Sequence, residues 1–255
     1  MMGRALLAVA FVFSFGLGLN AHAQTTKESK SEAAARLHAE LGARYHRVGQ
    51  VAVAVDELKL ALDARSDYVP ALTLLGLIEA QLHQNEQADA HFTQALAAAQ
   101  NQKINDTDIR NSYAWFLCGS DRGEQALAEF ATVFRDPVYP SMGKALTNAG
   151  VCAARLGRDD LALAYLNATL DRDANNAVAL IYRGHVFVNA RQYANAHNDW
   201  RAAQKLQNDE PTIAWLEIRL AQAERQRMTA RDTLIRDYPT SLEAEWARSA
   251  QYNKF

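Results

Sequence analysis

The chain has 255 residues, of which 22% are charged, and its formal net charge is −2 at pH 7. It carries no basic stripe and no run of interleaved aromatic and basic residues, so we expect no binding to nucleic acid. Only twelve Gly and five Pro occur, and no run alternates apolar with polar residues, so an all-α fold is predicted.

The N-terminal residues have the pattern of an export signal. Arg4 precedes an apolar run from Ala5 to Leu19, and Ala21-His22-Ala23 fits a small-x-small cleavage site. The run is shorter than the roughly 20 residues that cross a bilayer as a helix, so no spanning membrane segment is expected. We predict a signal peptide at 1–23, a polar leader at 24–31 and a periplasmic location.

Small and large residues recur with a period near 34, the length of a tetratricopeptide (TPR) unit, across residues 32–241. In each unit a small residue of the first helix is expected to face a large residue of the second, so that the two helices approach closely. Six units are predicted, the sixth degenerate because Ile218 replaces the small residue, and residues 242–255 form a capping helix and tail. The small and large pairs of the first five units are Gly42/Leu58, Gly76/Phe92, Ala114/Phe130, Gly150/Leu166 and Gly184/Trp200.

The spacing between units widens to 38 and 36 residues on either side of the third unit. We assign four extra residues to the polar stretch Asn101–Asp106 and two to the Pro-bearing segment Asp136–Pro140. Glycine is expected at turns inside units, where it easily takes a left-handed backbone, at Gly49, Gly123 and Gly157.

Cys118 and Cys152 are the two cysteines, and they fall in the first helices of units three and four. These helices are expected side by side, with the two positions offset by about 3 Å along the axis. In an exported chain this placement predicts a disulfide. The alternatives are two buried free thiols or a reactive thiol.

We find no sequence motif for catalysis or for a cofactor. The histidines form no His-Glu-x-x-His pair, no serine lies in a Gly-x-Ser-x-Gly elbow, and two thiols alone do not complete a metal site. A non-enzymatic protein without metal or cofactor is expected, and a thiol-dependent enzyme is the least favoured alternative.

Protein binding in the groove of the TPR array is the expected activity. The inward-pointing positions of the first helices carry aromatic, amide and cationic side chains, which suit an extended or helical peptide. The alternative is that the tryptophans among them only fill space between helices. The predicted partner-binding residues are Asn111, Trp115, Lys144, Thr147, Arg155, Ile181, His185 and Asn189, with Trp215 and Arg219 from unit six, while Tyr113, Phe116 and Leu117 are assigned to the core.

Three motifs in order resemble a known family. They are Asn-x-Tyr-x-Trp-Phe-Leu-Cys at 111–118, Asp-Pro-x-Tyr-Pro at 136–140 and Asn-Ala-Gly-Val-Cys at 148–152. With the six-unit array and the export signal, they resemble the type IV pilus biogenesis and stability proteins of the PilW/PilF kind. The resemblance implies a non-enzymatic, periplasm-facing scaffold that helps the outer-membrane secretin of the pilus to assemble, and a disulfide between Cys118 and Cys152.

The sequence departs from this family in its membrane attachment. Family members are typically lipoproteins, whereas no cysteine that could carry a lipid precedes Cys118. We expect the chain to be soluble in the periplasm or peripheral to the outer membrane through its partner. A general periplasmic TPR adaptor unconnected to pili is the alternative function.

Overall fold

The computed structural model describes residues 29–206, 211–223 and 227–249, which contain thirteen helices and no strand. The helices are α1 Lys30–Arg47, α2 Val51–Ala64, α3 Val69–Gln81, α4 Asn85–Gln102, α5 Thr107–Gly119, α6 Gly123–Val133, α7 Met142–Arg155, α8 Asp159–Arg172, α9 Ala177–Asn189, α10 Tyr193–Leu206, α11 Pro211–Ala223, α12 Arg227–Asp237 and α13 Leu242–Arg248.

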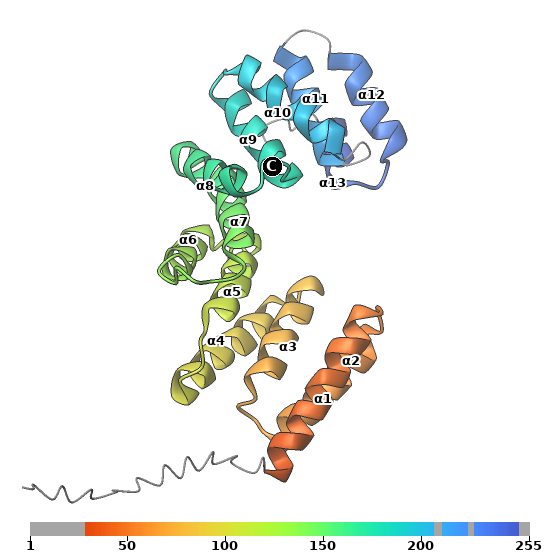
Figure 1. Cartoon of the computed structure of the whole chain (residues 1–255). Coiled ribbons are helices and arrows are strands. Elements are labelled where there is room, and N and C mark those ends of the chain that lie inside the picture. The colour runs from red at the N-terminus through yellow and green to blue at the C-terminus, as the bar shows by residue number, and fades with distance from the viewer. Residues whose placement is uncertain (1–28, 207–210, 224–226, 250–255) are drawn as a thin grey trace, which may run out of the picture.

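Successive helices pair into hairpins, from α1 with α2 to α11 with α12, and α13 packs against α11 and α12. Each hairpin also contacts the next one along the chain. Figure 1 shows the hairpins following one another in a curved array, with α1 and α2 at one end and α12 and α13 at the other. The predicted all-α array of helix-turn-helix repeats is therefore confirmed.

The predicted N-terminal segments lie almost wholly outside the described residues. The signal peptide at 1–23 is not covered, and only the end of the leader at 24–31 is. The Ser29 hydroxyl accepts a hydrogen bond from the Glu32 backbone N–H at 3.0 Å and so caps α1. The helix therefore starts at Lys30, inside the predicted leader.

Small and large residues face each other inside the hairpins, as the repeat pattern predicts. A Cβ atom on Gly42 would lie 2.7 Å from Leu58 Cγ, and one on Gly150 would lie 2.7 Å from Leu166 Cγ. Real side chains do not approach so closely, so any larger residue at either glycine would force the two helices of its hairpin apart.

The fifth hairpin departs from this pattern, and the prediction of Trp200 as its large residue is wrong. Gly184 instead faces Leu216 of α11, 2.6 Å from an added Cβ, and the Cβ of Asp199 at 3.6 Å. Asp199 points toward α9 because its carboxylate accepts two hydrogen bonds from Arg183, at 2.8 and 2.7 Å.

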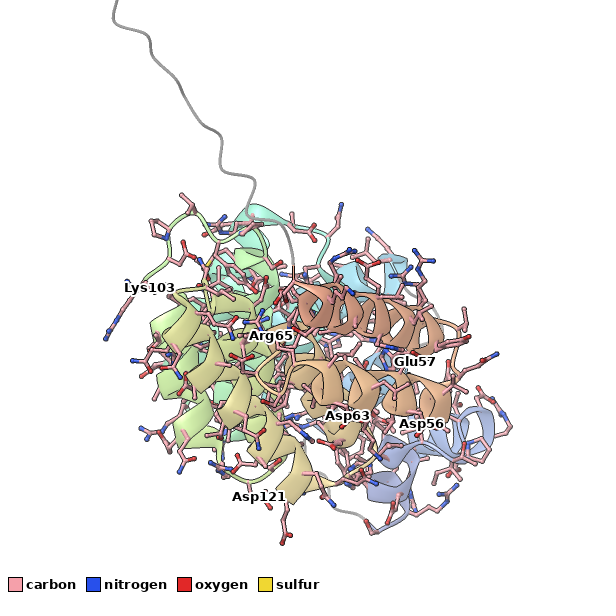
Figure 2. The ribbon with its side chains drawn as sticks, turned by 90° about the horizontal axis from the view of Figure 1, so that it is seen from below. Asp56, Glu57, Asp63, Arg65, Lys103 and Asp121 are labelled. Atoms are coloured by element: carbon pink, nitrogen blue, oxygen red, sulfur yellow. A yellow bond between two sulfur atoms is a disulfide. The ribbon has the colours of Figure 1, made fainter. Side chains whose placement is uncertain are left out.

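A left-handed residue recurs at the turn inside each of the first five hairpins. Their φ angles lie between 57° and 77°, the range that favours glycine. The prediction of Gly123 as the third of them is wrong: Asp121 takes this conformation, and Gly123 opens α6, where an added Cβ would lie 2.6 Å from Leu156. Asp121 is exposed, as Figure 2 shows together with Lys103, a left-handed residue between hairpins. The five turn residues are Gly49, His83, Asp121, Gly157 and Arg191.

The four extra residues before unit three lengthen a helix and not a connection. Helix α4 has 18 residues where α2 has 14, and residues 101 and 102 are helical. Our placement of these residues in a connector is therefore wrong. Ala98 and Ala99 are buried and extend the packed face of α4, which ends only where Lys103 becomes left-handed.

The Pro-bearing connection between α6 and α7 is long, as predicted, and it holds the start of α5. Tyr139 donates a hydrogen bond to Asp108 at 2.7 Å. The Asp136 carboxylate accepts hydrogen bonds from Asn105 at 3.2 Å and from Thr107 at 3.0 Å, which lower its pKa. The connections on the two sides of the α5–α6 hairpin therefore contact each other.

Candidate partner-binding site

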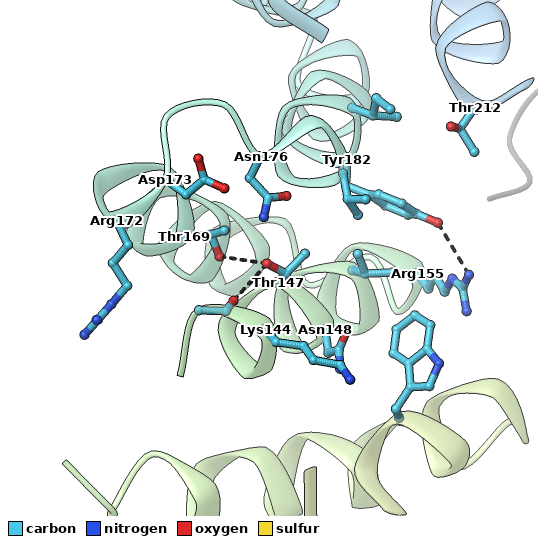
Figure 3. A pocket seen from close by; sticks show the side chains of 15 residues that line it. Lys144, Thr147, Asn148, Arg155, Thr169, Arg172, Asp173, Asn176, Tyr182 and Thr212 are labelled. Carbon is cyan, nitrogen blue, oxygen red and sulfur yellow. Dashed lines mark hydrogen bonds between the residues drawn. The ribbon is translucent and has the colours of Figure 1, made fainter. Parts of the chain in front are cut away.

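A cavity of about 630 Å³ lies along α7, bounded by α5 on one side and by α8, α9 and the start of α11 on the other. Figure 3 shows its lining side chains, which come from all five helices and from the connection between α8 and α9. The site is therefore built by three neighbouring hairpins and the first turn of a fourth.

Helix α7 forms the floor of this cavity through one stripe of side chains. Lys144, Asn148, Val151 and Arg155 line the cavity, and their spacing of four, three and four residues places them on a single helix face. Thr147 lies beside them and donates a hydrogen bond to the Gly143 carbonyl at 2.9 Å. The stripe runs for about 16 Å at 1.5 Å per residue.

Trp115, Arg155 and Tyr182 join three helices at one end of the stripe. The guanidinium of Arg155 lies 5.5 Å from the centroid of the Trp115 indole, and it donates a hydrogen bond to the Tyr182 hydroxyl at 3.4 Å. Trp115 is 40% exposed and also lines a second hollow, of about 300 Å³, between α3 and α5. This indole therefore stands between two hollows with much of its surface open to a partner.

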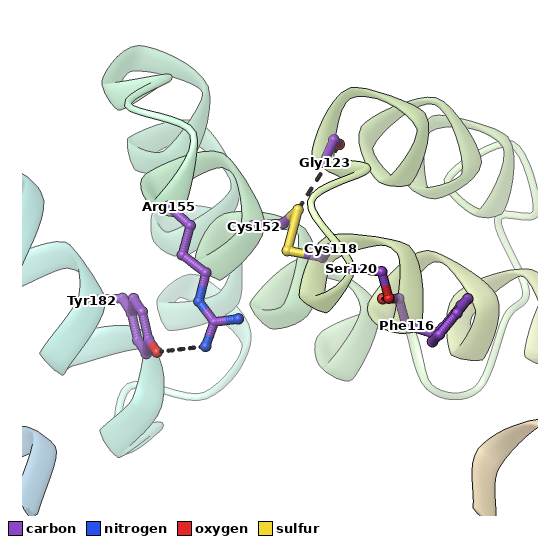
Figure 4. Close-up of a disulfide and its surroundings, with 7 residues drawn as sticks. All are labelled: Phe116, Cys118, Ser120, Gly123, Cys152, Arg155 and Tyr182. Atoms are coloured by element: carbon purple, nitrogen blue, oxygen red, sulfur yellow. Dashed lines mark hydrogen bonds between the residues drawn. A yellow bond between two sulfur atoms is a disulfide. The ribbon is translucent and has the colours of Figure 1, made fainter. Parts of the chain in front are cut away.

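A disulfide between Cys118 and Cys152 cross-links α5 to α7 next to this cluster. The two Cα atoms are 5.7 Å apart, within the usual range for a disulfide, and Cys152 is fully buried. Cys118 lies three residues after Trp115, and Cys152 lies three residues before Arg155, so the cross-link is one helical turn from both stacked side chains. Figure 4 shows the disulfide together with Arg155 and Tyr182. Both cysteines take part in this disulfide, so the described part of the chain contains no free thiol.

The structure brings five of the eight predicted binding residues to the cavity: Trp115, Lys144, Thr147, Arg155 and Ile181. Asn111 lies one turn from Trp115 but is only 4% exposed and lines neither hollow. Tyr139 of the α6–α7 connection covers this part of α5. The prediction of Asn111 as a partner contact is corrected for that reason.

His185, Asn189 and Arg219 were also predicted in the groove, but they bind one another. Arg219 of α11 is buried and donates to His185 Nδ1 at 3.1 Å and to Asn189 Oδ1 at 2.5 Å. Burial lowers the pKa of Arg219 to about 10, against the opposing effect of the Asp159 carboxylate. These residues connect α9 to α11 and line no described part of the cavity.

Folding stability is expected to depend on pH through His185. Burial and then the Arg219 charge lower the pKa of this histidine well below its ordinary value, so it stays neutral in the fold. The unfolded chain takes up a proton below about pH 6.5, and the stabilisation present above that pH is lost as the pH falls, by up to about 1.4 kcal/mol per unit. Urea unfolding of wild type and His185→Gln between pH 7.5 and 5.5 measures this slope. The slope of unfolding free energy against pH should be shallower in His185→Gln than in wild type. Equal slopes would contradict the role of His185 in this pH dependence.

Trp215 is a core residue and not a groove residue. It is 1% exposed, and its ring lies 5.8 Å from that of Trp246 in α13. The space-filling alternative is therefore correct for Trp215, whereas Trp115 remains accessible. Tyr113, Phe116 and Leu117 are buried in the core, as expected.

Several cavity residues were not predicted from the sequence. Asn148 and Val151 could have been found by continuing the α7 periodicity from Lys144. Asn176 caps α9 by accepting a hydrogen bond from the Ala179 backbone N–H at 2.9 Å, and an Asn before an apolar helix is a recognisable signal. Tyr182 had no such signal, because its place depends on how α9 packs on α7.

The described residues contain no group of three or more His, Cys, Asp or Glu that could hold a metal ion. Among the described helices, none is both long and apolar enough to cross a bilayer.

Sequence comparison places the chain near a pilus protein. No family model matches it. It is similar to the type IV pilus assembly protein PilF of Pseudomonas aeruginosa, with 28% identity over 214 residues that cover 80% of this chain and 81% of that protein.

Structural comparison gives a matching result. The fold is similar to the crystal structure of PilW, described as a widely conserved type IV pilus biogenesis factor, with 26% identity, a TM-score of 0.73 and coverage of 83% of this chain and 96% of that one. P. aeruginosa PilF has 21% identity, a TM-score of 0.71 and coverage of 87% and 100%. YrrB, a TPR protein with an unusual peptide-binding site, shares the fold with 17% identity, a TM-score of 0.57 and coverage of 78% and 100%.

Proposed function

We propose that this chain, which is homologous to the TPR-type type IV pilus biogenesis proteins PilF and PilW, is a pilus-related scaffold that binds a protein partner in the cavity along α7. The partner is a component of pilus assembly, with the outer-membrane secretin as the first candidate. The scaffold acts in the periplasm, either soluble or held at the outer membrane by that partner.

The observation that carries the binding role is the exposed cluster of Trp115, Arg155 and Tyr182. Large aromatic and arginine side chains are enriched among the residues that dominate binding energy at protein interfaces. Here they come from α5, α7 and α9 and meet at a hollow rather than in the core. Among the Phe, Trp and Tyr residues of the described part of the chain, only Trp115 and Tyr193 are exposed, and of these two only Trp115 lines a hollow, which is best explained by a partner that covers it.

The proposed mechanism is non-enzymatic and consists of shape and side-chain complementarity. Both cysteines are in a disulfide, so neither offers a nucleophile. Homology to pilus TPR proteins and structural likeness to a TPR protein with a peptide-binding site support a scaffold.

Replacing the exposed indole is expected to weaken secretin capture while leaving the fold intact. The Trp115→Ala variant should capture about tenfold less secretin than wild type from detergent-solubilised outer membranes. The reason is that truncating an exposed anchor of this kind removes much of its contact area with the partner. Circular dichroism should show unchanged helicity. The matched control is Tyr193→Ala, an aromatic of similar exposure on α10 and outside the cavity.

The cellular test is deletion of the gene, followed by complementation with wild type, Trp115→Ala or Tyr193→Ala. We expect loss of secretin multimers and of twitching motility, restored by wild type and by the control variant. Normal multimers and normal twitching in the deletion strain would remove the pilus assignment and leave a general adaptor. Loss of helicity in Trp115→Ala would instead mean that the indole belongs to the core.

A further inference from the structure

We propose that the cavity along α7 selects an extended peptide segment with two acidic residues about five positions apart and small apolar residues between them. One acidic side chain binds Arg155, and the other binds Lys144. This inference rests on the proposed function, because it names the chemistry of the partner segment that the same cavity captures.

The charge of the cavity is opposite to that of the chain. Three cationic side chains line it, Lys144, Arg155 and Arg172, against one carboxylate, Asp173. The whole chain carries a formal charge of −2. A cationic hollow in an acidic chain raises the local concentration of acidic ligands and discriminates against cationic ones.

Among the described residues, the three cavity cations have no carboxylate partner. No ion pair within 4 Å is found for any of them among the described residues. By contrast, Arg110, Arg158 and Arg183, in the same part of the array, all pair with carboxylates at 2.6 to 2.8 Å. A carboxylate from a partner would therefore meet cations that need not break an internal ion pair first.

The spacing of the cations along the floor sets the spacing of the acids. Lys144 and Arg155 are eleven residues apart on one face of α7, a rise of about 16 Å. An extended peptide advances about 3.3 Å per residue, so the same length holds five residues. Thr147 and Thr169 lie 3.5 Å apart, which places the end of α8 beside the start of α7, where the Arg172 side chain points away from Lys144 (Figure 3).

The middle of the cavity offers what a peptide between two acids requires. Val151 and Ile181 provide an apolar surface, and both are nearly buried, so they fit small apolar side chains rather than large ones. Asn148 and Asn176 line the same region. Because Asn176 uses its oxygen to cap α9, its side-chain N–H groups remain to donate to a peptide carbonyl.

The test uses three blocked peptides of equal length. The first has two glutamates five positions apart, separated by Ala-Val-Val-Ala. The second has glutamines in place of the glutamates. The third has the two glutamates two positions apart with the same composition. Calorimetry at low salt should show the first peptide binding about tenfold tighter than either of the others, which corresponds to about 1.4 kcal/mol. Its affinity should fall as salt rises, because the paired charges are screened.

Charge-removing variants locate the site. Lys144→Gln and Arg155→Gln should each reduce affinity for the first peptide and abolish its advantage over the glutamine peptide. The matched controls Lys59→Gln and Arg44→Gln remove the same charges from exposed positions on α2 and α1 and should bind as wild type does. Equal loss in the controls would mean a diffuse charge effect and would overturn the proposal.

Other outcomes separate this inference from the proposed function. If the three peptides bind equally or not at all, while Trp115→Ala still abolishes secretin capture, the acidic-peptide inference is wrong and the scaffold role stands. If inorganic phosphate competes fully with the first peptide and the peptide with closely spaced glutamates binds as tightly as the first, the cavity is a general anion site. If the peptide preference holds but the deletion strain is normal for pili, the pocket chemistry is right and the pilus role is wrong.

Discussion

Loss of the Cys118–Cys152 disulfide is expected to lower the free energy of unfolding by about 2–5 kcal/mol, as is usual for removal of a native disulfide. The two cysteines are 34 residues apart in sequence, so the cross-link restricts a long loop in the unfolded chain. Urea unfolding of wild type with and without reductant, and of the double variant Cys118→Ala/Cys152→Ala, measures the effect. Reduced wild type and the double variant should unfold at similar, lower urea concentrations than oxidised wild type.

The same change is expected to weaken partner binding. The disulfide is one helical turn from the stack of Trp115 on Arg155, so it fixes the distance between α5 and α7 at the place where the cavity opens. Without the disulfide, Trp115 and Arg155 sample a wider range of relative positions in the free protein. Fixing them in the bound arrangement then costs more conformational entropy, which lowers affinity for the partner. Secretin capture is measured without urea, at a temperature where both the oxidised wild type and the double variant are folded. This separates the effect on binding from the effect on stability. Identical unfolding and capture for both forms would show that the cross-link carries neither role.

The repeat architecture was predictable from the sequence because it depends on local features. A small residue facing a large one across a hairpin needs only two helices and a short turn, and Gly42 with Leu58 and Gly150 with Leu166 show this contact. The α7 part of the site was predictable for the same reason. Lys144, Thr147 and Arg155 lie on one face of a single helix, so helical periodicity is enough to group them.

The wrong predictions about the connection before α5 and about Gly123 have physical causes that the local sequence pattern does not reveal. The residues after Ala99 are polar and form either a loop or a helix end, and nothing in the sequence indicates that Lys103 is the left-handed residue that ends α4. Gly123 resembled a turn glycine, but it is small because Leu156 of the next hairpin packs against it. Here the side chain that explains the glycine comes from a different unit.

The misplaced binding residues also reflect packing between units. His185 and Asn189 occupy inward positions of α9, but α11 approaches closely enough for Arg219 to bind both. Trp215 is covered because α13 brings Trp246 against it. Both outcomes depend on the degenerate sixth unit and the closing helix, where the repeat pattern is weakest.

Breaking the ion pair between Arg183 and Asp199 is expected to destabilise the C-terminal half of the array by about 2–4 kcal/mol in the Asp199→Ala variant. Arg183 donates to both carboxylate oxygens of Asp199, whose side chain is 6% exposed, and it also donates to Asn167 at 2.7 Å. Removing the carboxylate leaves a largely buried guanidinium with part of its hydrogen bonding lost. The remaining bond to Asn167 and the 23% exposure of Arg183 limit the loss to the lower part of the range for buried pairs.

A matched surface pair provides the control for this prediction. Arg158 donates to Glu124 at 2.6 Å, but their side chains are 58% and 64% exposed, so Glu124→Ala should change stability by less than about 1 kcal/mol. The Arg183→Met/Asp199→Leu double variant should recover part of the loss, because no charge is then left unpaired. Hydrogen exchange should show the largest increase in α9 and α10. Since α9 carries Ile181 and Tyr182 into the cavity, opening of this hairpin should also reduce peptide affinity. An Asp199→Ala variant whose hydrogen exchange in α9 equals that of wild type would contradict the structural role given to the Arg183–Asp199 pair.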